Sequence, residues 1–167
     1  CIRDRVERVA ADAPLPVRVI HRTDNTGGLG GAVAVGLEAA ASDLCIVMDG
    51  DLQHPPELLP ALVRRHDEGD ADVVAASRYI GGGDMSGLGT AVRFGVSRSA
   101  TWLTRAMFPI RLARSTDPMT GFFLVDRSRL DLSALRPQGF KILLEILART
   151  DLRLAEVPME FLSLIHI

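Results

Sequence analysis

The chain has little of what marks several classes of protein. Its 167 residues include two cysteines, Cys1 and Cys45, which are too few for a disulfide framework or a cysteine-rich metal site. No stretch approaches the roughly 20 apolar residues that a membrane-spanning helix needs. The first residues also lack the pattern of a signal peptide. A reducing cytoplasm is therefore the expected location.

Lysine is almost absent as well, because Lys141 is the only one and arginine supplies the remaining basic side chains. The formal net charge is -2, and 47% of the residues are hydrophobic. This balance is typical of a globular domain and does not favour nucleic-acid binding. The length suffices for a sizeable core. Since no internal repeat or boundary divides the sequence, we expect a single domain over residues 1–167.

Short apolar runs alternate with segments of helical spacing. We expect strands at 17–20, 44–48, 72–77, 121–125 and 152–157, and helices at 32–41, 55–68, 91–108 and 138–150. Strands that alternate with helices predict an α/β domain with a mainly parallel sheet.

An acidic pair closes the apolar run 44–48. Asp49 and Asp51 flank Gly50 at an expected strand end, which is where open α/β sheets bind ligands. Alternate residues of an extended strand face one side, so both carboxylates can face one site, where they repel each other unless a cation lies between them. Oxygen ligands favour Mg²⁺ or Mn²⁺, which commonly carry substrate phosphates, and Gln53 offers a third oxygen. The alternative is a turn whose aspartates cap the next helix.

The stretch 47–63 resembles the DxD region of family 2 glycosyltransferases, and more narrowly that of the polyprenyl-phosphate (dolichyl-phosphate) mannosyltransferase group. The resemblance extends over about residues 17–161. It implies a GT-A fold that here lacks its first strand, a sheet flanked by helices, and a Mg²⁺ or Mn²⁺ cofactor. It also implies GDP-mannose as donor, a polyprenyl phosphate at the membrane surface as acceptor, and inversion at the anomeric carbon. The enzyme would then be peripheral on the cytoplasmic face of the membrane.

The resemblance also assigns roles to individual residues. The donor would be bound by Asn25, in the glycine-rich loop 22–31, together with Asp49, Gly50 and Asp51. The metal would be held by Asp49, Asp51 and Gln53. The acceptor phosphate would be held by Arg78, Arg93 and Ser97. Asp117, in the segment 117–122 that matches an Asp-Pro-x-Ser-Gly-Phe motif with Thr in place of Ser, would orient the sugar or the acceptor phosphate. The expected catalytic residues are Asp49, Asp51, Arg78 and Asp117.

The residues themselves leave several alternatives open. The loop 22–31 is either a phosphate cradle or a tight turn that starts a helix. The segment 91–116 has five arginines among apolar residues, which suits a membrane interface or an ordinary amphipathic helix. Lys141 either contacts a phosphate or lies on a solvated face, and Glu145 either pairs with an arginine of the site or lies on that face. His54 has no metal-ligand partner at a useful spacing in the sequence.

Other functions remain as alternatives to mannosyl transfer. The same fold could use a UDP-sugar donor or a glycan acceptor. A phosphatase built on Asp-x-Asp does not fit, because residues 52–54 are not the Gly and Thr or Val that such enzymes need. The chain ends predict a fragment, which could be inactive. The sequence has no initiator Met and departs from the family pattern after Phe161, so residues 1–5 and 162–167 are expected to include non-native ones.

Overall fold

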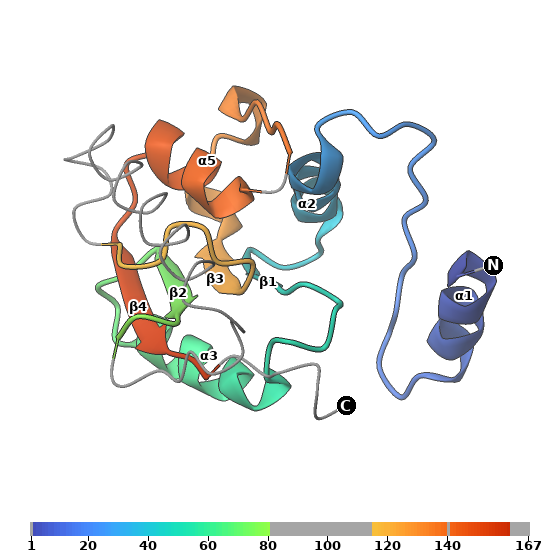
Figure 1. The fold of residues 1–167 in the computed structure, drawn as a ribbon, viewed down its shortest axis with the longest axis horizontal. Coiled ribbons are helices and arrows are strands. Elements are labelled where there is room, and N and C mark those ends of the chain that lie inside the picture. The colour runs from blue at the N-terminus through green and yellow to red at the C-terminus, as the bar shows by residue number, and fades with distance from the viewer. Residues whose placement is uncertain (1, 81–114, 140, 161–167) are drawn as a thin grey trace, which may run out of the picture.

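A computed structural model describes residues 2–80, 115–139 and 141–160 (Figure 1). Helices cover both faces of a four-stranded sheet, and helix α1 (Ile2–Asp12) lies apart from this body at the N-terminus. The expected helix at 91–108, with Arg93 and Ser97, falls outside the described residues.

The sheet has the strand order β1-β3-β2-β4. Its strands are β1 (Leu44–Val47), β2 (Val73–Ser77), β3 (Phe123–Asp126) and β4 (Leu154–Pro158). β2 and β4 are parallel, while β3 is antiparallel to both β1 and β2. Three strands therefore run in one direction, as expected, but the sheet is mixed in its pairings. An apolar run does not encode the direction in which a strand enters a sheet, so the reversal of β3 was not predictable from its pattern.

The expected strand at 17–20 is not formed, and the prediction was wrong. Val17 and Ile20 lie in irregular chain with 51% and 44% of their surface exposed. β-branched residues favour strands chiefly because they pack on a half-buried pleated surface. Within the described residues this segment pairs with no strand, so its β-branched side chains have no sheet surface on which to pack.

Three helices pack on the sheet. Helix α2 (Gly28–Ala39) begins four residues earlier than expected, inside the glycine-rich loop. Helix α3 (Leu59–Asp67) follows a 3₁₀ turn at Pro56–Leu58, where proline suits the first helical positions because it has no N–H to lose. Helix α5 (Ile142–Arg149) precedes β4. Further 3₁₀ turns lie at Arg127–Arg129 and Leu132–Ala134.

Strand alternation divides the core into two clusters, one on each face of the sheet. Val73 and Phe123 face α2 and α5, whereas Val74 and Leu124 face α3. Every residue of β2 is buried, which is typical of a strand covered by helices on both faces. Full burial of a side chain such as Leu124 stabilises the fold by about 2 kcal/mol. The two clusters thus fix the register of the central strands, and with it the loops at their ends.

Candidate active site

The carboxyl ends of β1, β2 and β4 lie at one edge of the sheet, because these three strands share a direction. Asp49 follows β1 by two residues and Arg78 follows β2 directly. The segment 115–121 reaches the same edge, because β3 runs the opposite way and begins there. Ligands of open α/β sheets bind at such an edge.

The acidic pair meets the segment before β3. A Cβ placed on Gly121 would lie 2.7 Å from Cγ of Asp49, so the carboxylate of Asp49 packs directly against the α-carbon of Gly121. Asp51 is exposed, and its Oδ1 accepts a hydrogen bond from the backbone N–H of Gln53 at 3.0 Å. Burial raises the pKa of Asp49, and the nearby charge of Asp51 adds to this rise. His54 and Lys141 oppose it as neighbouring cations.

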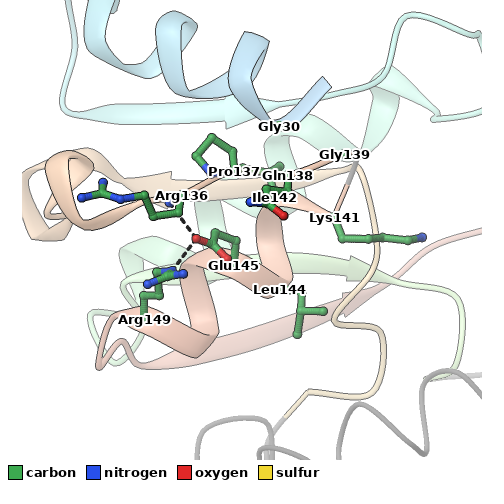
Figure 2. A pocket seen from close by; sticks show the side chains of 10 residues that line it. All are labelled: Gly30, Arg136, Pro137, Gln138, Gly139, Lys141, Ile142, Leu144, Glu145 and Arg149. Atoms are coloured by element: carbon green, nitrogen blue, oxygen red, sulfur yellow. Dashed lines mark hydrogen bonds and ion pairs between the residues drawn. The ribbon is translucent and has the colours of Figure 1, made fainter. Parts of the chain in front are cut away.

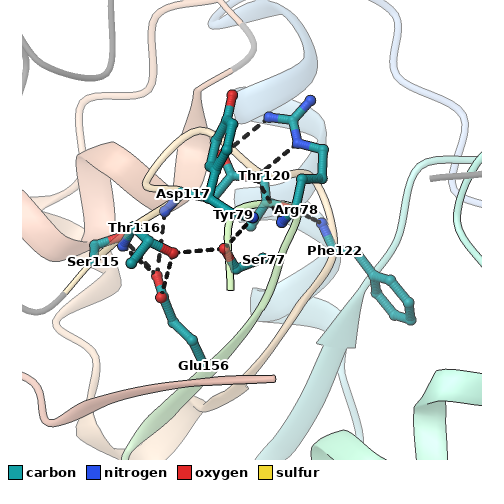
Figure 3. Close-up of polar contacts among 9 residues, drawn as sticks. All are labelled: Ser77, Arg78, Tyr79, Ser115, Thr116, Asp117, Thr120, Phe122 and Glu156. Atoms are coloured by element: carbon teal, nitrogen blue, oxygen red, sulfur yellow. Dashed lines mark hydrogen bonds and ion pairs between the residues drawn. The ribbon is translucent and has the colours of Figure 1, made fainter. Parts of the chain in front are cut away.

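Arg78 and Asp117 form a two-pronged ion pair (Figure 3). Nε of Arg78 donates to Oδ2 of Asp117 at 2.7 Å, and one terminal nitrogen donates to Oδ1 at 2.9 Å. Asp117 is completely buried. Burial acts to lower the pKa of Arg78, but the hydrogen bonds and charge of Asp117 outweigh it and raise that pKa. Part of the Arg78 charge, expected to serve a phosphate, is therefore already matched by a protein carboxylate.

Lys141 reaches the same site from the start of α5. Burial lowers the pKa of Lys141, and the positive charge of Arg78 lowers it further, while Asp117 and Asp49 act in the opposite direction. The only lysine of the chain thus lies within electrostatic range of Asp49 and of the Arg78–Asp117 pair.

A pocket of about 270 Å³ lies beside Lys141 and is lined by the start of α2, the segment 136–139 and helix α5 (Figure 2). Glu145 lines this pocket and accepts a hydrogen bond from the backbone N–H of Arg136 at 2.7 Å. It also pairs with Arg149, one helical turn away. The sequence left open whether Glu145 pairs with an arginine of the site or lies on a solvated face, and in the structure its arginine partner is Arg149 of the same helix.

The glycine-rich loop is built for close packing. The backbone N–H groups of Gly28, Gly30 and Gly31 donate to the carbonyls of Asn25, Gly139 and Gly27. A Cβ on Gly30 would lie 3.2 Å from the carbonyl oxygen of Gly139, so glycine permits the approach of α2 to the segment 137–139. These amides are engaged within the protein, which favours the turn-and-helix-start interpretation over a phosphate cradle. Asn25 is exposed on this loop, and its role in donor binding stays a prediction.

His54 is a site residue that the sequence reasoning missed. Its ring is buried, lies 5.4 Å from the ring of Phe122 and is hydrogen-bonded to the Asp49 backbone. Burial lowers the pKa of His54, against the charges of Asp49 and Asp51, which raise it. In the sequence, His54 has no metal-ligand partner at a useful spacing, so the spacing of residues did not indicate a role for it. Its place directly after the acidic turn was the signal available.

Comparison with known proteins identifies the family. The model of the family described as "Glycosyl transferase family 2" matches residues 2–133, which is most of the chain. The chain belongs to this family. The resemblance inferred from the sequence is therefore confirmed.

Two curated relatives of this family 2 chain act on lipid phosphates, according to their names. The chain is 38% identical over 147 residues to a dolichol-phosphate mannosyltransferase of Pyrococcus furiosus. This alignment covers 87% of the chain and 41% of the relative. It is 32% identical over 169 residues to an undecaprenyl-phosphate mannosyltransferase of Micrococcus luteus, with 96% of the chain and 66% of the relative covered. The chain spans about half the length of the curated relatives it matches.

The GT-A fold is confirmed by a solved structure. Glucosyl-3-phosphoglycerate synthase from Mycobacterium tuberculosis, in complex with Mn²⁺, uridine diphosphate and glucosyl-3-phosphoglycerate, matches with a TM-score of 0.60. The match covers 95% of this family 2 chain and 56% of the synthase at 22% identity, which establishes the shared fold. Among the helices described for residues 2–80, 115–139 and 141–160, none has both the length and the apolar character of a membrane span.

The oxygen ligands in the loop after β1 suit a divalent metal that is also coordinated by a substrate. No three His, Cys, Asp or Glu side chains gather as a metal site within the described part of this family 2 chain. Asp49 and Asp51 instead offer two carboxylates, and Gln53 offers an amide oxygen. Mg²⁺ in particular is bound by one or two carboxylates together with waters and substrate phosphates. A metal held only by these residues would therefore depend on the phosphates of a bound nucleotide.

Proposed function

We propose that this chain carries the catalytic site of a metal-dependent polyprenyl-phosphate mannosyltransferase. It would transfer mannose from GDP-mannose to a polyprenyl phosphate with inversion at the anomeric carbon. The names of the relatives support the sugar and the lipid. The observation that carries the proposal is the contact between Asp49 and Gly121. It joins the acidic pair, suited to the donor diphosphate, to the segment whose Asp117 holds Arg78.

The donor side is assigned to the loop after β1. Asp49, Asp51 and Gln53 would hold a divalent Mg²⁺ or Mn²⁺ ion, which when bound would neutralise the charge that grows on the leaving GDP. The backbone at Gly50 is exposed, and among the described residues no atom beyond its chain neighbours lies within 4 Å of where a Cβ would stand, which leaves room for a ligand. We assign Asn25 to the donor as well.

The acceptor side is assigned to Arg78 and Lys141, with Arg93 and Ser97 as further phosphate ligands outside the described residues. An oxygen of the acceptor phosphate would form a bond to the anomeric carbon while the bond from that carbon to the GDP oxygen breaks. The phosphate is already an anion at neutral pH, so this attack needs no strong general base. The protein residues then act by positioning and by charge stabilisation, which together can supply most of the rate enhancement.

The membrane is the place where this chain would meet its acceptor. A polyprenyl phosphate keeps its chain in the bilayer and its phosphate at the surface. We place the protein on the cytoplasmic face as a peripheral enzyme, since nucleotide sugars are the donors.

Calorimetric titration of GDP and UDP, each with and without Mn²⁺, tests the donor assignment. We expect Mn²⁺-dependent binding that prefers GDP and weakens at least about tenfold in Asp51→Asn, because a carboxylate ligand is lost. Asp151→Asn is the matched control, since Asp151 is exposed and precedes β4 at the opposite edge of the sheet. Equal binding by wild type and Asp51→Asn would refute the metal site. A preference for UDP would replace the proposed donor with a UDP-sugar.

Transfer itself is tested with GDP-[¹⁴C]mannose and a short-chain polyprenyl phosphate in detergent. We expect labelled lipid from wild type and from Asp151→Asn, and none from a folded Asp51→Asn. A wild-type chain that binds GDP and Mn²⁺ but labels no lipid would refute the acceptor.

A further inference from the structure

Glu156 holds the segment before β3 onto the edge strand β4. Its carboxylate accepts four hydrogen bonds from three consecutive residues (Figure 3). The donors are the backbone N–H and Oγ1 of Thr116, each at 2.6 Å, Oγ of Ser115 at 3.2 Å and the backbone N–H of Asp117 at 3.3 Å. The segment that contains Asp117 is therefore tied down on both sides of Thr116.

The direction of the hydrogen bonds follows from counting protons. Oγ1 of Thr116 has one proton, which it donates to Glu156, so it can only accept in its 2.6 Å contact with Oγ of Ser77. Ser77 consequently donates its own hydroxyl proton to Thr116 and accepts from the backbone N–H of Tyr79 at 3.1 Å. One chain of donors thus runs from Tyr79 through Ser77 and Thr116, and ends on Glu156.

This chain of hydrogen bonds involves the residues on either side of Arg78 and the residue before Asp117. Ser77 and Tyr79 are the neighbours of Arg78 in the sequence, and Thr116 is the neighbour of Asp117. Ser77 and Glu156 lie on one face of the sheet, because β2 and β4 are parallel with Ala75 opposite Glu156, and alternate residues of a strand share a face. Thr116 links the two side chains. Glu156 therefore fixes the backbone on both sides of the ion pair without touching either charged side chain in the contacts described here.

We propose that Glu156 is a positioning residue that sets the geometry of Arg78 and Asp117 for the acceptor phosphate. The inference rests on the proposed function for its catalytic consequence, and on the hydrogen bonds alone for its structural one. A carboxylate suits the role because both of its oxygens only accept. The amide of a glutamine would turn an N–H₂ group toward donors on one side and break the chain there.

Paired variants separate positioning from folding. Glu156→Gln and Thr116→Val interrupt the chain of donors at two points, and Thr116→Ser keeps the hydroxyl as the matched control. Two readouts are measured on the whole chain. The first is kcat/KM for a short-chain polyprenyl phosphate together with the Kd of GDP with Mn²⁺. The second is the ¹H–¹⁵N signal of the Arg78 Nε–H, assigned by its loss in Arg78→Lys and slowed in exchange by its bond to Asp117.

We expect Glu156→Gln and Thr116→Val to lower kcat/KM for the acceptor by about tenfold, as for a lost hydrogen bond to a charged group. The Arg78 signal should broaden or shift in both, the Kd of GDP should stay within about twofold of wild type, and Thr116→Ser should behave as wild type. Unchanged acceptor kinetics and an unchanged Arg78 signal in both variants would overturn the proposal. Loss of GDP binding or of cooperative unfolding in both would also overturn it, because the role would then be structural only.

The two proposals fail in different ways. If wild type transfers no mannose, the proposed function fails, and the Arg78 signal still decides whether Glu156 positions the ion pair. If wild type transfers mannose but the variants do so equally well, the positioning role fails and the proposed function stands.

Discussion

Replacing Gly121 by alanine is expected to disturb the acidic pair without unfolding the protein. The new Cβ would lie 2.7 Å from Cγ of Asp49 and 3.1 Å from its Oδ1. Carbon atoms in contact are about 3.5–4.0 Å apart, so the carboxylate must move by about 1 Å. A displacement of that size at a reacting centre lowers the rate by about a hundredfold. Because Asp49 is only half-buried and its side chain can rotate, the loss in unfolding free energy should stay at about 1–3 kcal/mol.

Gly50→Ala is the control, since it makes the same chemical change between the two aspartates. Apart from its chain neighbours, no atom of residues 2–80, 115–139 and 141–160 lies within 4 Å of a Cβ at Gly50, so the carboxylates can stay in place. The assay compares Mn²⁺-dependent GDP binding and mannosyl transfer in the two variants, with urea unfolding to establish that both are folded. Wild-type binding and turnover in Gly121→Ala would refute the assignment of Asp49 to the reacting centre. A larger loss in Gly50→Ala than in Gly121→Ala would show that the loop backbone, rather than the position of Asp49, governs the site.

Two further predictions concern stability. Side-chain hydrogen bonds from Arg153 lower the pKa of Asp72, so the stabilisation by this pair is present above the ordinary pKa of 3.8 and is lost as the pH falls through the lowered value. Asp72→Asn should therefore destabilise the protein in urea at neutral pH but change little well below pH 3.8, and a constant difference across that range would contradict the linkage. Leu52 has a φ of 64° and is 65% exposed, so Leu52→Gly should be more stable than Leu52→Ala by about 1 kcal/mol. Equal urea midpoints for the two Leu52 variants would show that this backbone conformation carries no strain.

Local patterns in the sequence were sufficient for four of the five expected strands and for the acidic end of β1. The eight residues 44–51 suffice to predict a strand that ends just before two aspartates, and β1 does end two residues before Asp49. The same local logic failed at Val17–Ile20, because strand formation needs a partner that the run itself does not specify. It was also ambiguous for the glycine-rich loop, where the hydrogen bond from Gly30 to Gly139 favours a tight turn that starts a helix over a phosphate cradle.

Long-range pairing was beyond the reach of the sequence. Arg78 and Asp117 are 39 residues apart, and each was assigned to a substrate before the structure showed that they bind each other. Glu156 is 40 residues from Thr116, and no local pattern marks it as an acceptor of four hydrogen bonds. Such pairs arise from strand order and register, which the periodicity of a single segment does not contain.

Because β3 runs in the reverse direction and begins at the active site, the site should open only when the whole fold unfolds. Phe123, the first residue of β3, lies beside Val47 and Ala75, so the polypeptide enters the sheet only two residues after Gly121. A slip of one residue would exchange Phe123 and Leu124 between the two cores, which the sheet can allow only by opening both. Amide hydrogen exchange at the start of β3 should then proceed only through global unfolding. Changes of specificity at this end of β3 would accordingly arise from the exchange of side chains at fixed backbone positions, since the register of β3 can change only by opening both cores.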